Sequence, residues 1–419
     1  MTHELEHDVI IIGAGAAGLA AAQQLKTAGV KALVLEARSR LGGRIWTDHT
    51  YAPVELGAEF IHGEHAATWQ FIEPAGLEAE TWPRGRQKGQ AYRNRFARQG
   101  RLLTDDTLAG RVDDLFEQVT TYTGPERSTG DLLLSLAGSD EEAALFVANG
   151  LACMEAAEVA RLSASALSQE RALNTAGWEN YHITAGYDTL PVLLAEGIEV
   201  RFDTAVTQIE WKERGVQLAV QGGQLLTARQ VIVTVPLGVL QSGRPRFLPG
   251  LPPAKQQAIE HLAMGHVTKL VLHFNQAFWP EFTFLRTDGF VLTWWPVGTA
   301  AAPALMGYTG GPAALKLAAL GQESAVEQGL QELGQILGNK ARSAFIAGRL
   351  VDWSTDPWSL GAYTYTPVGA GQARADLAAP LAPTLFFAGE ATATNGHLAT
   401  VHGAIETGQR AAAEVLAAR

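Results

Sequence analysis

The sequence predicts an α/β fold built around a dinucleotide-binding unit, and three features near its start lead to this class. Residues 8–12 form a β-branched apolar run that is typical of a strand buried on both faces. Residues 13–18 then read Gly-Ala-Gly-Ala-Ala-Gly, and an Ala- and Leu-rich stretch after them predicts a helix that ends before Gly29. A second strand is expected at residues 32–35, with Glu36 at its tip. This order of elements is typical of βαβ units that bind dinucleotides.

Each glycine of the turn has its own physical reason. Gly13 permits the tight turn, Gly15 lets the backbone approach a pyrophosphate, and Gly18 lets the helix pack closely on the strand. The helix N-terminus directs N–H groups and the positive end of its dipole toward the phosphates. Glu36 lies 18 residues after Gly18, where its carboxylate can accept hydrogen bonds from ribose hydroxyls.

Composition excludes several classes of protein. The 419 residues are 47% hydrophobic and 18% charged, which suits a large core and, at roughly 150 residues per domain, two to three domains. The net charge of −11 argues against a nucleic-acid partner. The single cysteine, Cys153, excludes intramolecular disulfides, four-cysteine zinc sites and cysteine-held iron–sulfur clusters. The sequence holds neither His-Glu-x-x-His nor Gly-x-Ser-x-Gly, so no metal site or serine hydrolase is expected.

The sequence also bears on location. Acidic residues stand near the start, where a secretory signal would be basic. The uncharged stretch 289–315 is interrupted by Pro296, Pro303 and Pro312, so it is predicted to form strands and turns of a buried region. We therefore expect no membrane partner and a cytoplasmic protein. The locally basic segment 84–101 is predicted to be a solvated loop or an exposed strand pair.

Motifs beyond the second strand distinguish flavin from nicotinamide binding. Arg38 and Arg40 flank that strand, residues 41–45 read Leu-Gly-Gly-Arg-Ile, and residues 55–63 read Glu-Leu-Gly-Ala-Glu-Phe-Ile-His-Gly. Near the C-terminus, residues 389–392 read Gly-Glu-Ala-Thr and residues 399–404 read Ala-Thr-Val-His-Gly-Ala. In these motifs and their order the sequence resembles the flavin-dependent amine oxidases, a family that includes monoamine oxidases, polyamine oxidases and flavin-type histone lysine demethylases.

The resemblance implies a Rossmann-like FAD-binding domain with an interleaved α+β substrate-binding domain. The FAD-binding domain is expected to comprise residues 1–75, 185–250 and 382–419, and the substrate domain residues 76–184 and 251–381. The resemblance leaves open the oligomeric state, the physiological amine and the role of His397.

The resemblance also assigns residues to the cofactor. Gly389 and Glu390 are implied to reach the flavin ribityl chain, and the last helix to aim its N-terminus at the N1–C2=O edge, where negative charge develops on reduction. Val206 stands where relatives hold the adenine, or else belongs to a strand core. The predicted cofactor-binding set is Gly13, Gly15, Ala16, Ala17, Gly18, Glu36, Ala37, Arg38, Gly42, Gly43, Arg44, Gly57, Ala58, Glu59, Phe60, Val206, Trp353, Trp358, Gly389, Glu390, Thr400 and Val401.

The resemblance further implies non-covalent FAD. Ala362 stands at the position where monoamine oxidases attach flavin through a cysteine, and Cys153 lies far from any such motif in the sequence.

A lysine in the middle of the chain is the first catalytic candidate. Residues 267–274 predict a strand whose alternation puts Lys269 on one face with Val267 and Val271. A lysine there is costly to bury unless it is paired or functional, or reaches water at a strand end. The resemblance implies that Lys269 holds a water against flavin N5 and assists reoxidation by oxygen.

The resemblance adds residues around the substrate. Tyr363 is implied to form one wall of an aromatic cage, with Thr400 at the position of the other wall and Trp358 near the flavin. His62 could hydrogen-bond the amine or adjust its protonation, and Glu59 could offer a carboxylate. The alternative for Tyr363 and Trp358 is an ordinary position in the hydrophobic core. The alternative for His62 is a hydrogen bond to the backbone, and for Glu59 it is a surface position or an ion pair. The predicted catalytic set is Lys269, Tyr363, His62 and Thr400.

The implied reaction is oxidation of a polyamine or monoamine. The amine α-carbon transfers a hydride equivalent to flavin N5, the resulting imine is hydrolysed to an aldehyde or ketone, and O2 becomes H2O2. The alternatives are a flavin desaturase or dehydrogenase acting on a carbon skeleton, an L-amino acid oxidase, or a non-catalytic amine-binding module.

Overall fold

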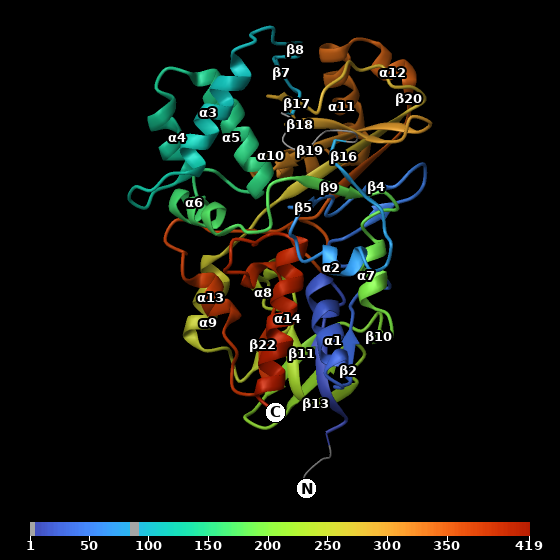
Figure 1. Cartoon of the computed structure of the whole chain (residues 1–419), viewed down its shortest axis with the longest axis vertical. Helices are drawn as coiled ribbons and strands as arrows, with labels where there is room; N and C mark the ends of the chain where they lie inside the picture. The colour runs from blue at the N-terminus through green and yellow to red at the C-terminus, as the bar shows by residue number, and fades with distance from the viewer. Residues whose placement is uncertain (1–4, 84–91) are drawn as a thin grey trace.

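The structure is a computed structural model that describes residues 5–83 and 92–419. Two large sheets lie toward opposite ends of the long axis of the molecule (Figure 1). The sheet with helices α1 (Ala16–Thr27) and α14 (Val401–Ala417) occupies the lower half of the view, together with the C-terminus. The sheet with α11 (Gly321–Leu337) and α12 (Lys340–Ala344) occupies the upper half. This mixture of helices with parallel and antiparallel strands confirms the predicted α/β class.

The lower sheet has eight strands and contains the predicted βαβ unit. Its order is β10-β2-β1-β13-β12-β11-β14, and β22 also pairs with β13. Strands β10, β2, β1, β13 and β22 run parallel, whereas β12 is antiparallel to both neighbours. The strands are β1 (His7–Ile12), β2 (Ala32–Leu35), β10 (Glu199–Arg201), β11 (Val206–Trp211), β12 (Val216–Val220), β13 (Leu225–Val233), β14 (Arg246–Leu248) and β22 (Leu385–Phe387).

Two long helices pack tightly on this sheet because glycines remove side chains where backbones meet. Helix α1 (Ala16–Thr27) follows the glycine turn, and helix α14 (Val401–Ala417) lies beside it (Figure 1). A Cβ added to Gly18 would lie 1.9 Å from the Gly13 carbonyl oxygen, and one added to Gly408 would lie 2.1 Å from the Ala17 carbonyl oxygen. The structure thus gives Gly18 the packing reason that the sequence predicts.

The upper sheet has seven strands in the order β20-β16-β19-β18-β17-β7-β8, and all its pairs are antiparallel except β17 with β7. Strand β16 coincides with the predicted strand, and every one of its residues is buried. The stretch 289–315 forms β18, β19 and, beyond the prediction, the start of helix α10. The strands are β7 (Asn94–Arg98), β8 (Arg101–Leu102), β16 (Val267–Phe274), β17 (Phe284–Thr287), β18 (Thr293–Gly298), β19 (Pro303–Gly310) and β20 (Phe345–Asp352).

The remaining helices and strands cover and connect the two sheets. Helices α3 to α6 form a group beside the upper sheet (Figure 1) with a hydrophobic core of their own. The remaining helices are α2 (Trp69–Ile72), α3 (Leu108–Thr120), α4 (Thr129–Ala137), α5 (Glu141–Glu155), α6 (Ala164–Leu173), α7 (Thr189–Leu194), α8 (Leu237–Gln241), α9 (Pro253–His261), α10 (Pro312–Ala318), α11 (Gly321–Leu337), α12 (Lys340–Ala344), α13 (Ala373–Ala378) and the 3-10 helix η1 (Glu390–Thr392). The remaining strands are β3 (Thr47–Asp48), β4 (Val54–Glu55), β5 (Ile61–His62), β6 (Ala79–Thr81), β9 (Asn180–Ile183), β15 (Ala263–Met264) and β21 (Thr364–Tyr365).

Two further predictions concern membrane-spanning helices and the basic segment 84–101. Within the described ranges, no helix combines the length and the apolar character that crossing a bilayer requires. Of the basic segment, Arg95, Arg98 and Arg101 belong to the strand pair β7 and β8. The other part of that prediction, on Arg84, Arg86 and Lys88, lies outside the described residues.

Gly18→Ala should destabilise the protein by about 1–3 kcal/mol, because the new Cβ collides with backbone that cannot move aside. The matched control is Gly110→Ala in helix α3, where no atom lies within 4 Å of the new Cβ and stability should rise by roughly 0.5–1 kcal/mol. Urea unfolding of both variants measures this difference. Equal effects at the two positions would contradict the packing argument.

Candidate functional site

A cavity of about 1030 Å³ is lined by residues from both large sheets. It brings together the glycine turn after β1, the segment 42–44, the segment 57–62, strand β16 and the start of helix α14. Every residue of the predicted cofactor-binding and catalytic sets lines this cavity except Gly18, which lies behind the turn and packs helix α1.

Two glycine loops face each other at the lower end of the cavity. The Gly42 N–H donates to the Ala14 carbonyl oxygen at 2.9 Å, and Gly15 and Gly42 form a parallel bridge. A Cβ added to Gly15 would meet no atom within 4 Å, so this backbone borders open space. Backbone N–H groups exposed on two sides of a groove form a cradle that fits a pyrophosphate.

Glu36 is held at the edge of this cradle. Its Oε2 accepts from the Ala14 N–H at 2.7 Å and its Oε1 from the Arg38 N–H at 2.8 Å. The carboxylate is 5% exposed and lines the cavity, and each oxygen keeps a further lone pair for a ligand hydroxyl. The Arg38 guanidinium is bonded to Asp356 in two places, at 2.6 and 2.8 Å. Sequence reasoning missed Asp356, because only the fold brings it to Arg38.

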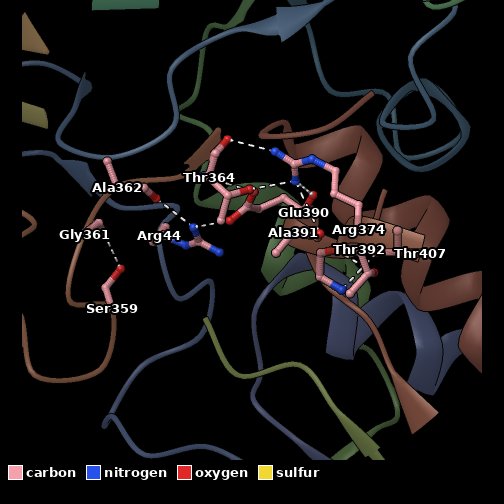
Figure 2. Close-up of polar contacts among 11 residues, drawn as sticks. Arg44, Ser359, Gly361, Ala362, Thr364, Arg374, Glu390, Ala391, Thr392 and Thr407 are labelled. Atoms are coloured by element: carbon pink, nitrogen blue, oxygen red, sulfur yellow. Dashed lines mark hydrogen bonds and ion pairs between the residues drawn. The ribbon is translucent and has the colours of Figure 1, made fainter. Parts of the chain in front are cut away.

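A second ion pair organises the opposite wall. Figure 2 shows the Arg44 Nη1 donating to Glu390 Oε1 at 2.8 Å and to the Ala362 carbonyl oxygen at 2.7 Å. The other Glu390 oxygen accepts from the Thr364 hydroxyl at 2.7 Å, and that hydroxyl accepts from Arg374 at 2.8 Å. Burial raises the pKa of Glu390, but the charges of Arg44 and Arg374 outweigh it and leave the pKa below its usual value. Glu390 is therefore a fixed carboxylate that holds Arg44 beside the cavity.

Thr400 has a structural role at the start of helix α14. Its Oγ1 accepts from the Gly403 N–H at 3.0 Å and donates to the His397 carbonyl oxygen at 2.7 Å, so Thr400 is the N-cap. Capping occupies the Thr400 hydroxyl, and the residue also lines the cavity, so its predicted place beside the substrate stays a prediction. The first turn of the helix still borders the cavity through Val401 and His402.

Lys269 is paired rather than solvated. Its Nζ donates to Glu59 Oε2 and to the Glu55 carbonyl oxygen, both at 2.8 Å, and the residue is 3% exposed. The other Glu59 oxygen accepts from Trp295 Nε1 at 2.8 Å. This excludes a lysine that reaches water at a strand end, and it resolves the alternatives for Glu59 in favour of a buried ion pair.

The aromatic wall contains a residue that sequence reasoning missed. Tyr308 stands opposite Lys269 on the neighbouring strand β19, and its hydroxyl lies 2.8 Å from the Tyr363 hydroxyl. The Trp295 and Tyr308 ring centroids are 5.4 Å apart. Tyr308 therefore joins Tyr363 in the cavity wall, which the predicted second wall residue, Thr400, also lines. Only the register between β16 and β19 could have identified Tyr308.

Two histidines, His62 and His402, line the cavity, and a third, His397, lies beside His402. His62 Nδ1 is 2.7 Å from Asn180 Oδ1; the side chain is exposed at the cavity, and desolvation there lowers its pKa below the usual value despite that bond. Burial, with the charges of His62 and His397, lowers the pKa of His402 to about 3. His397 pairs with Glu406 at 2.8 Å. His62 thus bonds a side chain rather than backbone and is neutral at neutral pH.

Further predicted residues of the site are Trp353, Trp358 and Val206. The Trp353 Nε1 donates to the Leu56 carbonyl oxygen at 2.9 Å, and this side chain packs against Gly57. Trp358 and Val206 line the cavity, Val206 at the first residue of β11. Cys153, distant from the flavin motifs in sequence, also lines the cavity, and burial raises the pKa of its thiol to about 11. It is a protonated thiol at neutral pH.

Comparison with known proteins agrees with this geometry. The family model described as flavin containing amine oxidoreductase matches residues 16–416. The chain is 32% identical to lysine-specific histone demethylase 1 homolog 2 of Arabidopsis thaliana over 98% of its own length and 58% of that relative. It is 30% identical to polyamine oxidase 3 of Oryza sativa subsp. japonica, over 97% and 88% of the two chains. The chain therefore spans little more than half of the demethylase homolog but most of the oxidase.

Solved structures share the whole fold. A double mutant of putrescine oxidase superposes with a TM-score of 0.83 at 25% identity and covers 99% of both chains. Cyclohexylamine oxidase from Brevibacterium oxydans IH-35A superposes with a TM-score of 0.82 at 23% identity and covers 98% of both chains. The second likeness concerns the fold alone.

Glu55→Gln should make the free energy of unfolding less dependent on pH. Burial raises the pKa of Glu55 to about 8 from 4.5, so between these values the folded state binds more protons than the unfolded state, and stability decreases as pH rises. Glutamine cannot titrate, so the variant should show a flatter profile from about pH 5 to 8. Urea unfolding across this range checks it, with the exposed Glu260→Gln as control. Parallel wild-type and Glu55→Gln profiles would refute the assignment.

Proposed function

The chain belongs to the family of flavin-containing amine oxidoreductases, which makes it an FAD-dependent enzyme acting on amines, and we propose that it oxidises a polyamine or a monoamine to an imine with O2 as electron acceptor. The observation that carries the proposal is the buried Lys269–Glu59 pair beside the Tyr308–Tyr363 pair, in the same cavity as the dinucleotide cradle. When bound, FAD accepts the hydride equivalent from the amine α-carbon and later passes two electrons to oxygen.

We assign the cofactor to the lower part of the cavity. Backbone around Gly15 and Gly43 would hold the pyrophosphate, and the Glu36 carboxylate a ribose hydroxyl. Arg44 and Glu390 are already paired with each other, so they would form a fixed part of the cavity wall rather than offer a net charge to the cofactor. The start of helix α14 would stabilise negative charge on the ring system.

Lys269 would position a water. An ammonium group has three N–H donors, and two of them bond Glu55 and Glu59. The third donor remains for a water in the cavity, which matches the role implied by the family resemblance. Because Glu59 and Trp295 fix the direction of Nζ, this water would have a defined place.

The substrate wall favours an uncharged amine. Aromatic and buried surroundings disfavour an ammonium, so an amine entering as a cation must lose its proton before it reacts. His62 is neutral, and when its Nδ1–H donates to Asn180 its Nε2 is left as an acceptor for that proton. Tyr308 and Tyr363 would then orient the amine over their rings.

The division into domains stays part of the proposal. We propose a cofactor-binding domain of residues 1–75, 185–250 and 382–419 and a substrate domain of residues 76–184 and 251–381. The strands of the eight-stranded sheet support the first grouping, and those of the seven-stranded sheet the second. We also propose a cytoplasmic location.

The proposal is tested by mixing the purified yellow protein with a panel of amines without oxygen and recording the flavin absorbance. At least one amine should bleach the flavin, and admitting air should restore the colour and release peroxide. If no amine bleaches it, amine oxidation is wrong for this chain. Bleaching without rapid peroxide formation would favour a dehydrogenase over an oxidase.

Lys269→Met should slow flavin reduction or reoxidation about tenfold or more, equivalent to about 1.4 kcal/mol of lost transition-state stabilisation, because no N–H remains to hold the water. Lys255→Met is the matched control. Lys255 is also buried and donates to a carbonyl oxygen, that of Leu377 at 2.8 Å, but it is absent from the cavity lining. Stopped-flow absorbance measures both half-reactions, and unchanged rates in Lys269→Met would remove its assigned role.

A further inference from the structure

A row of side chains crosses one face of the upper sheet and ends at an arginine. Lys269 stands opposite Tyr308, Tyr308 opposite Thr293, and Thr293 opposite Arg286, on strands β16, β19, β18 and β17. Directly opposed residues share a face of a sheet, and all four line the cavity. At about 4.8 Å per strand, the backbone of Arg286 lies roughly 14 Å from that of Lys269.

Arg286 differs from the other arginines of the cavity in having no polar partner for a buried nitrogen. Its Nε is buried without a hydrogen bond, and among the described residues no carboxylate lies within 4.0 Å of its guanidinium. Asp113, the acidic residue that influences it electrostatically, is itself exposed. By contrast, Arg38 and Arg44 form ion pairs. Arg171 stacks on Trp178 at 4.5 Å.

The protein makes room for this guanidinium. Gly150 lies inside helix α5, where glycine costs about 1 kcal/mol relative to alanine, and a Cβ there would lie 2.9 Å from Arg286 Nη1. Asn149 ties the same turn to strand β17 by donating to the Thr287 carbonyl oxygen at 3.1 Å. Phe284 lies on the same face, with its ring 5.8 Å from the guanidinium carbon. The arginine is thus seated between a helix and a sheet with its charge unneutralised.

We propose that Arg286 is a specificity residue that binds a carboxylate at the far end of the amine substrate, which would then be an ω-amino acid. This inference rests on the proposed amine oxidation. An unpaired, half-buried guanidinium is unfavourable until an anion neutralises it, and a carboxylate does so with two parallel hydrogen bonds. An α-amino acid does not fit, because its carboxylate is attached to the reacting carbon and cannot reach a residue three strands away from Lys269.

Two carboxylates of the cavity offer the competing arrangement, in which a second amine binds instead. Burial raises the pKa of Glu155 to about 7 and that of Glu170 to about 8, although Arg374 lowers both and Arg171 also lowers that of Glu155. Glu170 also accepts from the Thr366 hydroxyl at 3.1 Å. These acids are largely protonated or balanced by arginines near neutral pH, so they attract a cation less than Arg286 attracts an anion.

The test compares a plain alkylamine, the ω-amino acid of the same chain length, its methyl ester and the matching diamine over a series of chain lengths. The ω-amino acid should exceed the alkylamine and the ester in kcat/KM about tenfold or more at the best length, as expected for a charge-assisted hydrogen bond. Arg286→Met should abolish this preference through KM, so that the ω-amino acid and the alkylamine react with similar kcat/KM. Arg286→Lys should restore part of it.

The control is Arg95→Met, which removes the same charge from an exposed position on the adjacent strand β7 and should retain the preference. Alkyl carboxylates without an amine supply a second measurement, since calorimetry should detect their binding to wild type and its loss in Arg286→Met. A diamine that reacts best, or a preference that survives Arg286→Met, would overturn the inference. If no amine bleaches the flavin, the proposed function fails, whereas carboxylate binding still tests Arg286 by itself.

Discussion

One buried ion pair joins the two halves of this molecule. Lys269 belongs to the seven-stranded sheet, and Glu59 to the segment that follows the cofactor cradle in the chain. Removing two charges from water costs several kcal/mol per ion, which only close geometry and further hydrogen bonds offset. Trp295 on one side and the Glu55 carbonyl on the other supply those bonds. The position of the substrate wall relative to the cradle therefore depends on this contact.

Around this pair the cavity separates two electrostatic environments. At the cofactor end, Arg38 and Arg44 are neutralised by Asp356 and Glu390, so backbone N–H groups are left to meet the phosphates. At the amine end, desolvation keeps the Cys153 thiol and the cavity histidines His62 and His402 uncharged near neutral pH. An amine placed there is favoured in the neutral form that can be oxidised.

Local patterns predicted much of this arrangement. The βαβ unit, strand β16 and the segments around Gly43, Gly57 and Glu390 are visible in sequence, because tight turns and buried strands impose their residue types locally. Family resemblance added the assignment of these segments to FAD. Patterns were less informative about single side chains: they did not show that Thr400 caps a helix, or that Cys153, remote in sequence, lies in the cavity wall.

By itself the sequence determined the α/β class, the dinucleotide cradle and the strand that contains Lys269, since each follows from residues close together in the chain. Only the tertiary structure decided the partners: Glu59 for Lys269, Asp356 for Arg38, Tyr308 for Tyr363, and none for Arg286 Nε. The physical reason is that partners depend on strand register and on contacts between distant segments, such as Arg44 and Glu390, which are 346 residues apart. Local propensity contains no information about either.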